Sequence, residues 1–173
     1  MGFTFETVYE QKAFTAMAKA LRKTVRRKRS RRSHIFGWFV VVLGLLLTVS
    51  DFGDGIIINM KNIVTWLAAL CILVVLIWED AMNGYMARRR MLKGMERTIT
   101  EFKEEHYTSV TELGRTEWQY DKIVCLAETT GYFVFVFSAN HAQVYDKASI
   151  SGGSVEEFRA FIEEKTGKST QRV

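Results

Sequence analysis

The sequence predicts an α+β membrane protein: a two-helix transmembrane hairpin joined to a small antiparallel sheet or open barrel that a C-terminal helix closes. Three observations predict this class. Two uncharged apolar runs, residues 35–50 and 63–78, stand twelve residues apart. Short segments rich in threonine and aromatic residues fill residues 97–147. A single amphipathic segment with helix-capping residues follows them, at residues 154–167.

Charge is unevenly distributed over the 173 residues. Residues 1–33 hold ten Lys/Arg against two acids, whereas residues 101–173 hold eight against twelve. This partition excludes a uniformly basic nucleic-acid binder, so no nucleic-acid partner is expected. Cys71 and Cys125 are the only cysteines, which excludes a disulfide scaffold.

Residues 1–33 are predicted to form a cytoplasmic strand and a basic amphipathic helix. The first residues, GFTFETVY, alternate apolar and polar side chains as a strand does. The helix is expected over residues 9–28, because one face collects Phe14, Met17, Ala18, Leu21 and Val25. Its basic side chains could lie on anionic lipid headgroups. Alternatively, its apolar face packs on the protein's own cytoplasmic domain while the arginines set the topology.

Residues 34–80 are predicted to form the transmembrane hairpin, with a short external loop. Each apolar run approaches the ~20 residues that cross a bilayer as a helix, and neither carries a polar stripe. Gly37 and Gly44 are seven residues apart, so they share one helix face. Small residues on that face would let the second span approach closely.

The orientation follows from the basic residues that flank the spans. Lys61 is the only basic residue in the loop between the spans, whereas several basic residues precede the first span and follow the second. The positive-inside rule then places both termini in the cytoplasm of a multi-pass plasma-membrane protein, with the lipid bilayer as one partner. The basic residues expected at the membrane surface are Arg22, Lys23, Arg26, Arg27, Lys28, Arg29, Arg31, Arg32, Arg88, Arg89 and Arg90.

Beyond the hairpin, residues 81–95 are predicted to continue as a membrane-proximal helix, and residues 96–167 to form a cytoplasmic domain. Turn signals separate six short candidate strands, at residues 97–102, 106–111, 116–120, 122–128, 132–137 and 142–146. The strand YFVFVF is apolar throughout, which predicts a central strand covered on both faces.

The segment after the strands carries the start and stop signals of a helix. Ser154 and Glu157 form a capping box, and Gly167 is a stop signal. Residues 168–173 are polar and are predicted to be a loose tail.

No catalytic, metal or cofactor site is expected. His34, His106 and His141 are isolated and show no metal-ligand spacing with either cysteine. The SGGS stretch at residues 151–154 lacks the Lys-Ser/Thr ending of a phosphate-binding P-loop. A non-enzymatic role is therefore expected.

Residues 118–150 resemble the YcxB-like family of small bacterial membrane proteins. The residues that carry the resemblance are Tyr120, Asp121, Ile123, Glu128, Thr129, Tyr132, Phe133 and Lys147. Asp146 stands where the family often has proline. The resemblance implies a short N-terminal strand and helix, a transmembrane hairpin, and a pleckstrin-homology-like (PH-like) C-terminal domain. It implies little about activity. With this fold, the N-terminal strand is expected to join the C-terminal sheet.

The expected function is that of a non-catalytic membrane protein that tethers an interaction module for a protein or peptide partner, in an immunity or a regulatory role. The alternative is a membrane-organising protein whose basic segments bind anionic lipid. A transporter or channel subunit is less favoured, because the interiors of the spans carry no ionisable residue.

Overall fold

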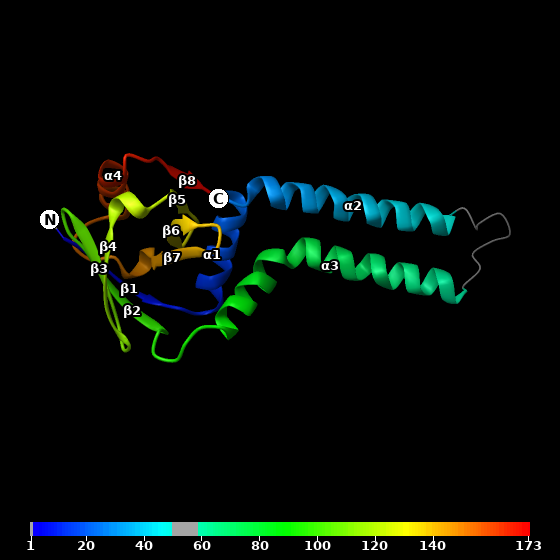
Figure 1. Cartoon of the computed structure of the whole chain (residues 1–173), viewed down its shortest axis with the longest axis horizontal. Helices are drawn as coiled ribbons and strands as arrows, with labels where there is room; N and C mark the ends of the chain where they lie inside the picture. Colours follow the sequence, from blue (N-terminus) through cyan, green and yellow to red (C-terminus); the bar gives the residue numbers. More distant parts are fainter. Residues whose placement is uncertain (1, 50–58) are drawn as a thin grey trace. The chain divides into compact units, whose positions relative to one another are not determined.

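The chain divides into two compact units in the computed structural model, which describes residues 2–49 and 59–173 (Figure 1). The first unit joins the N-terminal residues, up to Arg27, to everything from Asp80 onward. The second unit is the apolar segment between them, Lys28–Glu79.

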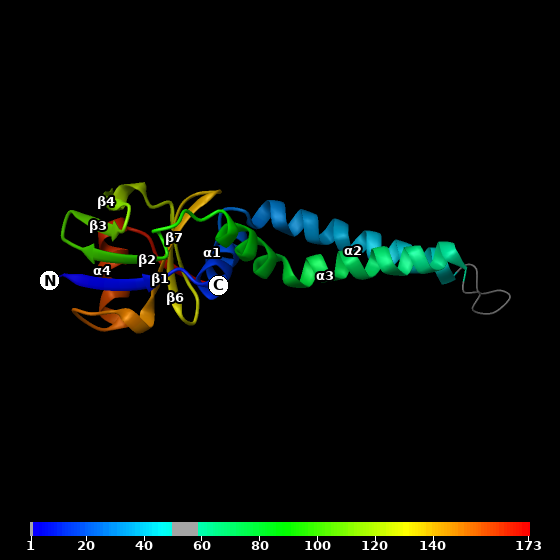
Figure 2. The same cartoon turned by 90° about the horizontal axis from the view of Figure 1, so that it is seen from below.

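Two four-stranded sheets form the first unit, and their strands cross (Figure 2). The first sheet has the order β1 (Phe3–Val8), β2 (Arg97–Phe102), β3 (His106–Thr111) and β4 (Gly114–Gln119). The second has the order β7 (His141–Asp146), β6 (Tyr132–Ser138), β5 (Cys125–Glu128) and β8 (Thr170–Arg172). No strand ladder joins the two sheets in the described part of the chain, so the predicted barrel is not closed.

The N-terminal strand β1 belongs to the same unit as the C-terminal strands, which confirms that expectation. It pairs antiparallel with β2, from Phe3 opposite Phe102 to Val8 opposite Arg97. Gly152 lets the loop before the last helix close over the start of β1. Its φ of +92° suits glycine, and a Cβ there would stand 2.2 Å from the carbonyl oxygen of Gly2.

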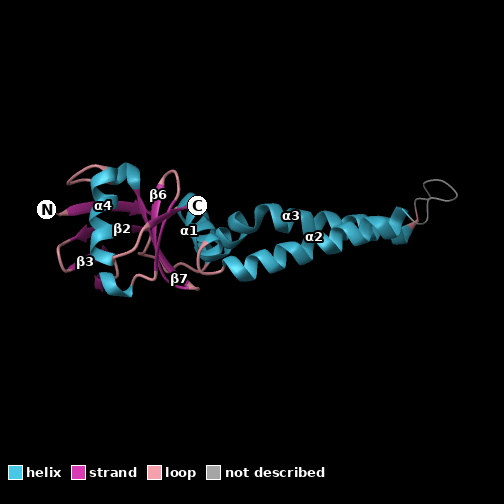
Figure 3. Cartoon of the chain, turned by 90° about the horizontal axis from the view of Figure 1, so that it is seen from above, coloured by secondary structure: helices cyan, strands magenta, loops and turns pink. Residues whose placement is uncertain are grey.

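Strand β6 is the central strand that its apolar sequence predicts. Phe133 and Phe135 lie in an aromatic core with helix α4 (Val155–Thr166), whereas Val134 and Val136 lie in a second core with helix α1 (Gln11–Lys23). The two helices therefore cover opposite faces of the second sheet (Figure 3).

Helix α1 packs apolar residues on the protein's own sheet, as one of the two alternatives expects. Its buried residues are Ala13, Phe14, Ala16, Ala20 and Leu21. Of the predicted face, Phe14 and Leu21 are buried, whereas Val25 lies beyond the helix and is exposed. The helix ends at Lys23 rather than at residue 28, because the backbone leaves helical geometry at Thr24.

Helix α4 begins and ends as predicted. Ser154 Oγ accepts a hydrogen bond from the Glu157 N–H at 3.2 Å, and the Glu157 carboxylate accepts one from the Ser154 N–H at 2.7 Å. Gly167 follows in the left-handed conformation, with φ +65°.

The C-terminal tail differs from the prediction that residues 168–173 are loose. Thr170–Arg172 forms β8, which pairs parallel with β5. The edge of β5 supplies backbone partners for the tail, because the Val173 N–H donates to the Glu128 carbonyl oxygen at 2.9 Å. The Thr170 N–H also donates to the Glu163 carboxylate at 2.6 Å.

The predicted helix over residues 81–95 is the last part of α3 (Met60–Arg89), which is kinked at Trp78 and ends at Arg89 rather than at residue 95. The chain then turns at Gly94, whose φ is +87°. Within the first unit this end of α3 contacts α1 closely. The Arg22 guanidinium donates two 2.6 Å hydrogen bonds to the Asp80 carboxylate. A Cβ on Gly84 would stand 2.8 Å from the backbone nitrogen of Thr15.

The second unit contains α2 (Arg27–Val49), which begins inside the basic segment rather than at residue 34, and the first part of α3. Both helices are long and apolar enough to cross a membrane, and only 11% of each apolar window is buried. Gly37 and Gly44 lie where α2 and α3 meet, since their Cβ positions face Leu76 and Thr65. Most of the predicted external loop, residues 51–58, lies outside the described residues.

Gly84→Val should lower the free energy of unfolding by about 2–3 kcal/mol, because the new methyl groups meet the α1 backbone rather than a movable side chain. Gly131→Val is the matched control, since nothing lies within 4 Å of its Cβ position. We expect the control to change stability by less than about 0.5 kcal/mol. Denaturation in detergent, followed by circular dichroism, measures both. Equal effects at the two glycines would contradict the close α1–α3 contact.

Candidate functional site

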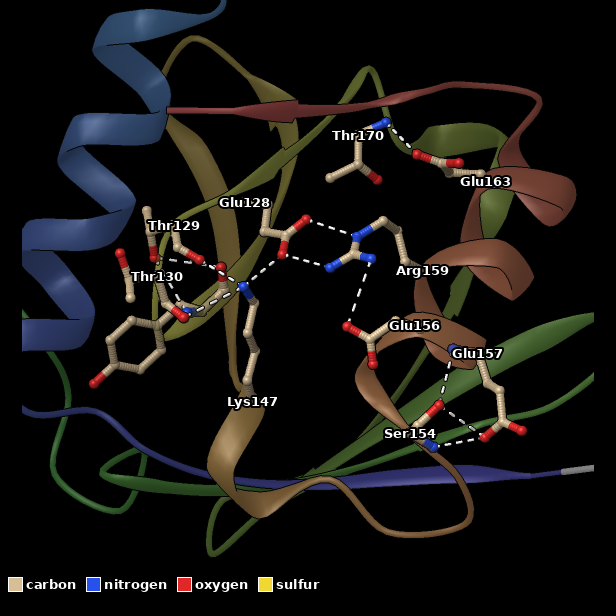
Figure 4. A network of polar contacts seen from close by, with 11 residues as sticks. Glu128, Thr129, Thr130, Lys147, Ser154, Glu156, Glu157, Arg159, Glu163 and Thr170 are labelled. Carbon is tan, nitrogen blue, oxygen red and sulfur yellow. Dashed lines mark hydrogen bonds and ion pairs between the residues drawn. The ribbon is translucent and has the colours of Figure 1, made fainter.

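Four residues of the resemblance motif lie together with Arg159. One of them, Glu128, supplies a buried carboxylate, and the others are Thr129, Phe133 and Lys147. Glu128 on β5 is 7% exposed, and the side chains of Lys147 and Arg159 point toward it (Figure 4). Arg159 on α4 donates two hydrogen bonds to Glu128 at 2.8 Å. Lys147 donates to Glu128 and to the Thr129 carbonyl oxygen, both at 2.6 Å, and its Nζ lies 5.1 Å from the centre of the Phe133 ring.

This cluster forms a structural clamp within the first unit. The hydrogen bond from Arg159, assisted by Lys147, lowers the pKa of Glu128 from its ordinary 4.5 to about 2. Glu128 is thus ionised at neutral pH and already binds both cations. The clamp joins β5, the short 3-10 turn Lys147–Ser149 after β7, and α4.

Sequence reasoning missed Arg159, although a signal was present. Arg159 stands four residues after Val155 and three before Ile162, so it occupies the apolar face of α4. A cation on a core-facing stripe indicates a buried anion nearby.

Of the other motif residues, Tyr132 adjoins the clamp through hydrogen bonds to Thr129, whereas Tyr120, Asp121 and Ile123 lie apart from it. Tyr120 begins the 3-10 turn Tyr120–Lys122, and its hydroxyl donates to the Lys103 carbonyl oxygen at 2.6 Å. Ile123 is buried in the aromatic core, and Tyr132 packs against the second core. Asp121 is exposed and lies 3.1 Å from Lys122.

A cavity of about 380 Å³ lies elsewhere in the first unit, between the first sheet, β7, α1 and the end of α3 with its following loop. Its floor is a row of hydroxyl groups on neighbouring strands, because Thr100 pairs with Ser109 and Ser109 pairs with Thr116. The next row along the same strands is aromatic, with Phe102, Tyr107 and Trp118 in register. The inward face of a sheet is normally apolar, but the half of the first sheet that carries the hydroxyl row is polar.

One amide organises the polar side of the cavity. Gln143 Oε1 accepts hydrogen bonds from the Tyr107 hydroxyl at 3.1 Å and the Tyr145 hydroxyl at 2.6 Å. Burial raises the pKa of Tyr145 well above its ordinary value, and raises that of Tyr9, also in the lining, to about 12. The phenols of Tyr145 and Tyr9 therefore stay neutral at physiological pH. Because its oxygen already accepts two hydrogen bonds, Gln143 has its amide NH₂ group left as a donor.

The opposite wall is apolar and rich in methionine. It consists of Phe14 and Met17 from α1, and of Ala87, Met91, Leu92 and Met95 at and beyond the end of α3. Arg90 and His141 also line the cavity, and no acidic residue stands among its described lining residues. Across the described ranges, no three His, Cys, Asp or Glu side chains lie close enough to hold a metal ion. The cavity is thus suited to binding a small molecule with polar and apolar ends.

The predicted membrane-surface residues fall into two groups. Arg22 is engaged with Asp80, and Arg26 donates to the Ala139 carbonyl oxygen at 2.6 Å and to Asn140 Oδ1 at 2.8 Å. The side chains of the others are exposed: Lys23, Arg27, Lys28, Arg29, Arg31, Arg32, Arg88, Arg89 and Arg90.

Comparison with protein families confirms the resemblance over part of the chain. Residues 102–162 match the family model described as YcxB-like protein. The match runs from the end of β2 into α4, so it includes Glu128, Lys147 and Arg159. Neither the curated proteins nor the solved structures contain a match to this chain.

Glu128→Gln should lower the free energy of unfolding at pH 7 by about 3 kcal/mol, because it leaves two cations without their buried partner. The pKa of Glu128 is lower in the folded protein, so its charge stabilises the fold above pH 4.5. This contribution is lost as the pH falls from 4.5 toward 2. The stability difference between wild type and variant should therefore shrink over that interval. Denaturant titration at several pH values measures it.

Glu156→Gln is the matched control for the clamp. Glu156 lies 3.9 Å from Arg159 but is 77% exposed, so its loss should leave stability nearly unchanged. A pH-independent difference between wild type and Glu128→Gln, or an equal effect of the control, would contradict the clamp.

Proposed function

We propose that the protein is a non-catalytic inner-membrane protein that tethers a PH-like interaction module at the cytoplasmic face, where it binds a protein or peptide. The observation that carries the proposal is the exposure of two long apolar helices. A core helix of a soluble protein would be mostly buried, whereas only 11% of each apolar window is buried here. A bilayer covers such a surface.

The distribution of charge supports the proposed orientation. In the sequence, the exposed basic residues of segments 27–32 and 88–90 flank the two apolar stretches at the ends that connect to the folded unit. The positive-inside rule then assigns that unit and both termini to the cytoplasm. Its strands β1–β7 followed by α4 also match the layout that a PH-like fold implies.

An exposed sheet edge supports a peptide partner. Among the described strands, β4 has β3 as its one neighbour, and all its residues except Trp118 are exposed. The backbone groups on its outer side can pair with an added strand, which is one of the recurring modes of peptide recognition. An immunity or regulatory protein that binds its target in this way is one form of the proposal.

The lipid-organising alternative rests on a smaller surface than the sequence indicated. The apolar face of α1 is buried in its own sheet, so this helix does not offer that face to a bilayer. The alternative then depends on the exposed basic segments at residues 27–32 and 88–90.

Cysteine labelling tests the anchoring and the orientation. In a Cys71→Ala, Cys125→Ala background, Asp54→Cys should react with a membrane-impermeant maleimide in intact cells. Ser169→Cys should react only after permeabilisation, because the C-terminus is proposed to be cytoplasmic. Extraction at alkaline pH should leave both variants in the membrane fraction. Labelling of Ser169→Cys in intact cells, or release by alkali, would overturn this part of the proposal.

Affinity purification in mild detergent separates the two functions. We expect a stoichiometric protein partner that survives charge reversal at Arg29, Arg31 and Arg32. Enrichment of anionic lipid alone, lost on charge reversal while insertion is retained, would favour the lipid-organising function instead. The control is a reversal of Lys122, an exposed cation on the folded unit.

A further inference from the structure

We propose that the cavity beside Gln143 binds a single-chain amphiphile whose head is an oxygen-rich anion, either a carboxylate or a phosphate monoester. The inference concerns a small-molecule site in the first unit and does not depend on the identity of the partner proposed above. Its volume of about 380 Å³ lies near the lower end of the ~300–1,000 Å³ that small-molecule sites occupy. A ligand of short or medium chain length suits this volume.

Hydrogen-bond donors dominate the polar end of the cavity. Gln143 directs its NH₂ group away from the two phenols that hold its oxygen. From the opposite wall, beside Met91, Arg90 adds a permanent positive charge to the lining, because guanidinium stays protonated. No described lining residue contributes a carboxylate that would compete for these donors. A donor-rich, cation-bearing surface selects a ligand with acceptor oxygens and negative charge.

Trp118 supplies the most specific observation. Its ring is held between neighbours, 5.1 Å from Phe137 and 5.5 Å from His141, centre to centre. Its Nε1–H is buried, yet it has no hydrogen-bond acceptor among the described residues. A buried N–H without an acceptor costs ~1–3 kcal/mol. Trp118 lines the cavity, so a ligand there can supply the acceptor once the ring turns its N–H toward the cavity.

The methionine-rich wall suits the chain of the amphiphile. Met17, Met91 and Met95 present flexible thioether side chains that adapt to an irregular apolar shape. Leu92 and Met95 are also among the exposed large apolar residues of the unit. The chain would cover this apolar surface, while the hydroxyl row of Thr100, Ser109 and Thr116 bounds the head. A cation, which needs carboxylates, and a purely polar ligand, which leaves the methionines uncovered, both fit less well.

Photolabelling of the full chain tests the proposal. The protein is reconstituted into nanodiscs of neutral phosphatidylcholine, and the probe is decanoate with a diazirine in its chain. Mass spectrometry quantifies labelling of the peptide that contains Met91, Leu92 and Met95. We expect saturable labelling of this peptide. Probe dissolved in the bilayer should label α2 without saturation, which provides an internal reference.

Competitors of equal chain length define the head group. Decanoate or decyl phosphate should displace the probe, and the stronger of the two identifies the anion. Decanol, decyltrimethylammonium and inorganic phosphate should displace it poorly. The first two lack the negative charge, and inorganic phosphate lacks the chain. Equal competition by decanol or by the ammonium compound would overturn the anionic head group.

Trp118→Phe separates ligand binding from folding. It removes the N–H without an acceptor but keeps an aromatic ring, so stability should be unchanged or slightly higher. The half-saturating probe concentration should rise about ten-fold, as for one lost hydrogen bond to a charged group. Glu117→Gln is the control, because Glu117 is next along β4 but outside the cavity lining. Non-saturable labelling would contradict the proposal. A Trp118→Phe variant that binds the probe as tightly as the wild type would contradict it too.

Discussion

The pairing of β1 with β2 is the constraint on which the rest of the first unit depends. It joins the first residues of the chain to strands that follow the whole apolar segment. Phe5 shows why the pairing matters: it is fully buried, and its ring contacts Phe102, Phe133, Tyr145 and Phe158. Strands of both sheets and helix α4 thus share one aromatic core built on β1. The apolar helices are an insertion into a single folded unit rather than a domain placed before it.

The buried polar groups of the first unit occur in two different arrangements. At the clamp, Glu128 receives donors from both Lys147 and Arg159, so every charge has a partner and the local structure is determined. At the cavity, donors outnumber carboxylates, and Trp118 keeps an N–H without an acceptor among the described residues. The first arrangement stabilises the fold, whereas the second leaves hydrogen-bonding capacity for a ligand. Glu128 and Gln143 stand on the same face of the second sheet, that of Phe133 and Phe135, but on different strands, β5 and β7.

Local sequence signals predicted most elements, because their physical causes are local. The alternation in β1 and β2, the apolar β6 and the capping box of Ser154 each depend on a few neighbouring residues. Apart from the joining of β1 to the later strands, which the family resemblance implied, features that depend on distant residues were not predicted. Strand β8 exists because β5 offers an edge, and the role of Arg159 needs Glu128, which is 31 residues away. The hydroxyl row needs the register of three strands, although inward-facing threonines at alternate positions were a visible signal.

The position of β1 in the chain also has a consequence for biosynthesis. Residues 3–8 leave the ribosome well before their partner strand, which begins only at residue 97, after both apolar helices have been made. At ~5–20 residues per second, this delay is on the order of ten seconds. During that time Phe3 and Phe5 have no core to enter, because the strands that complete the core have not yet been made. The unit therefore folds only after the apolar helices have been synthesised, and β1 must be kept from aggregating until the later strands arrive.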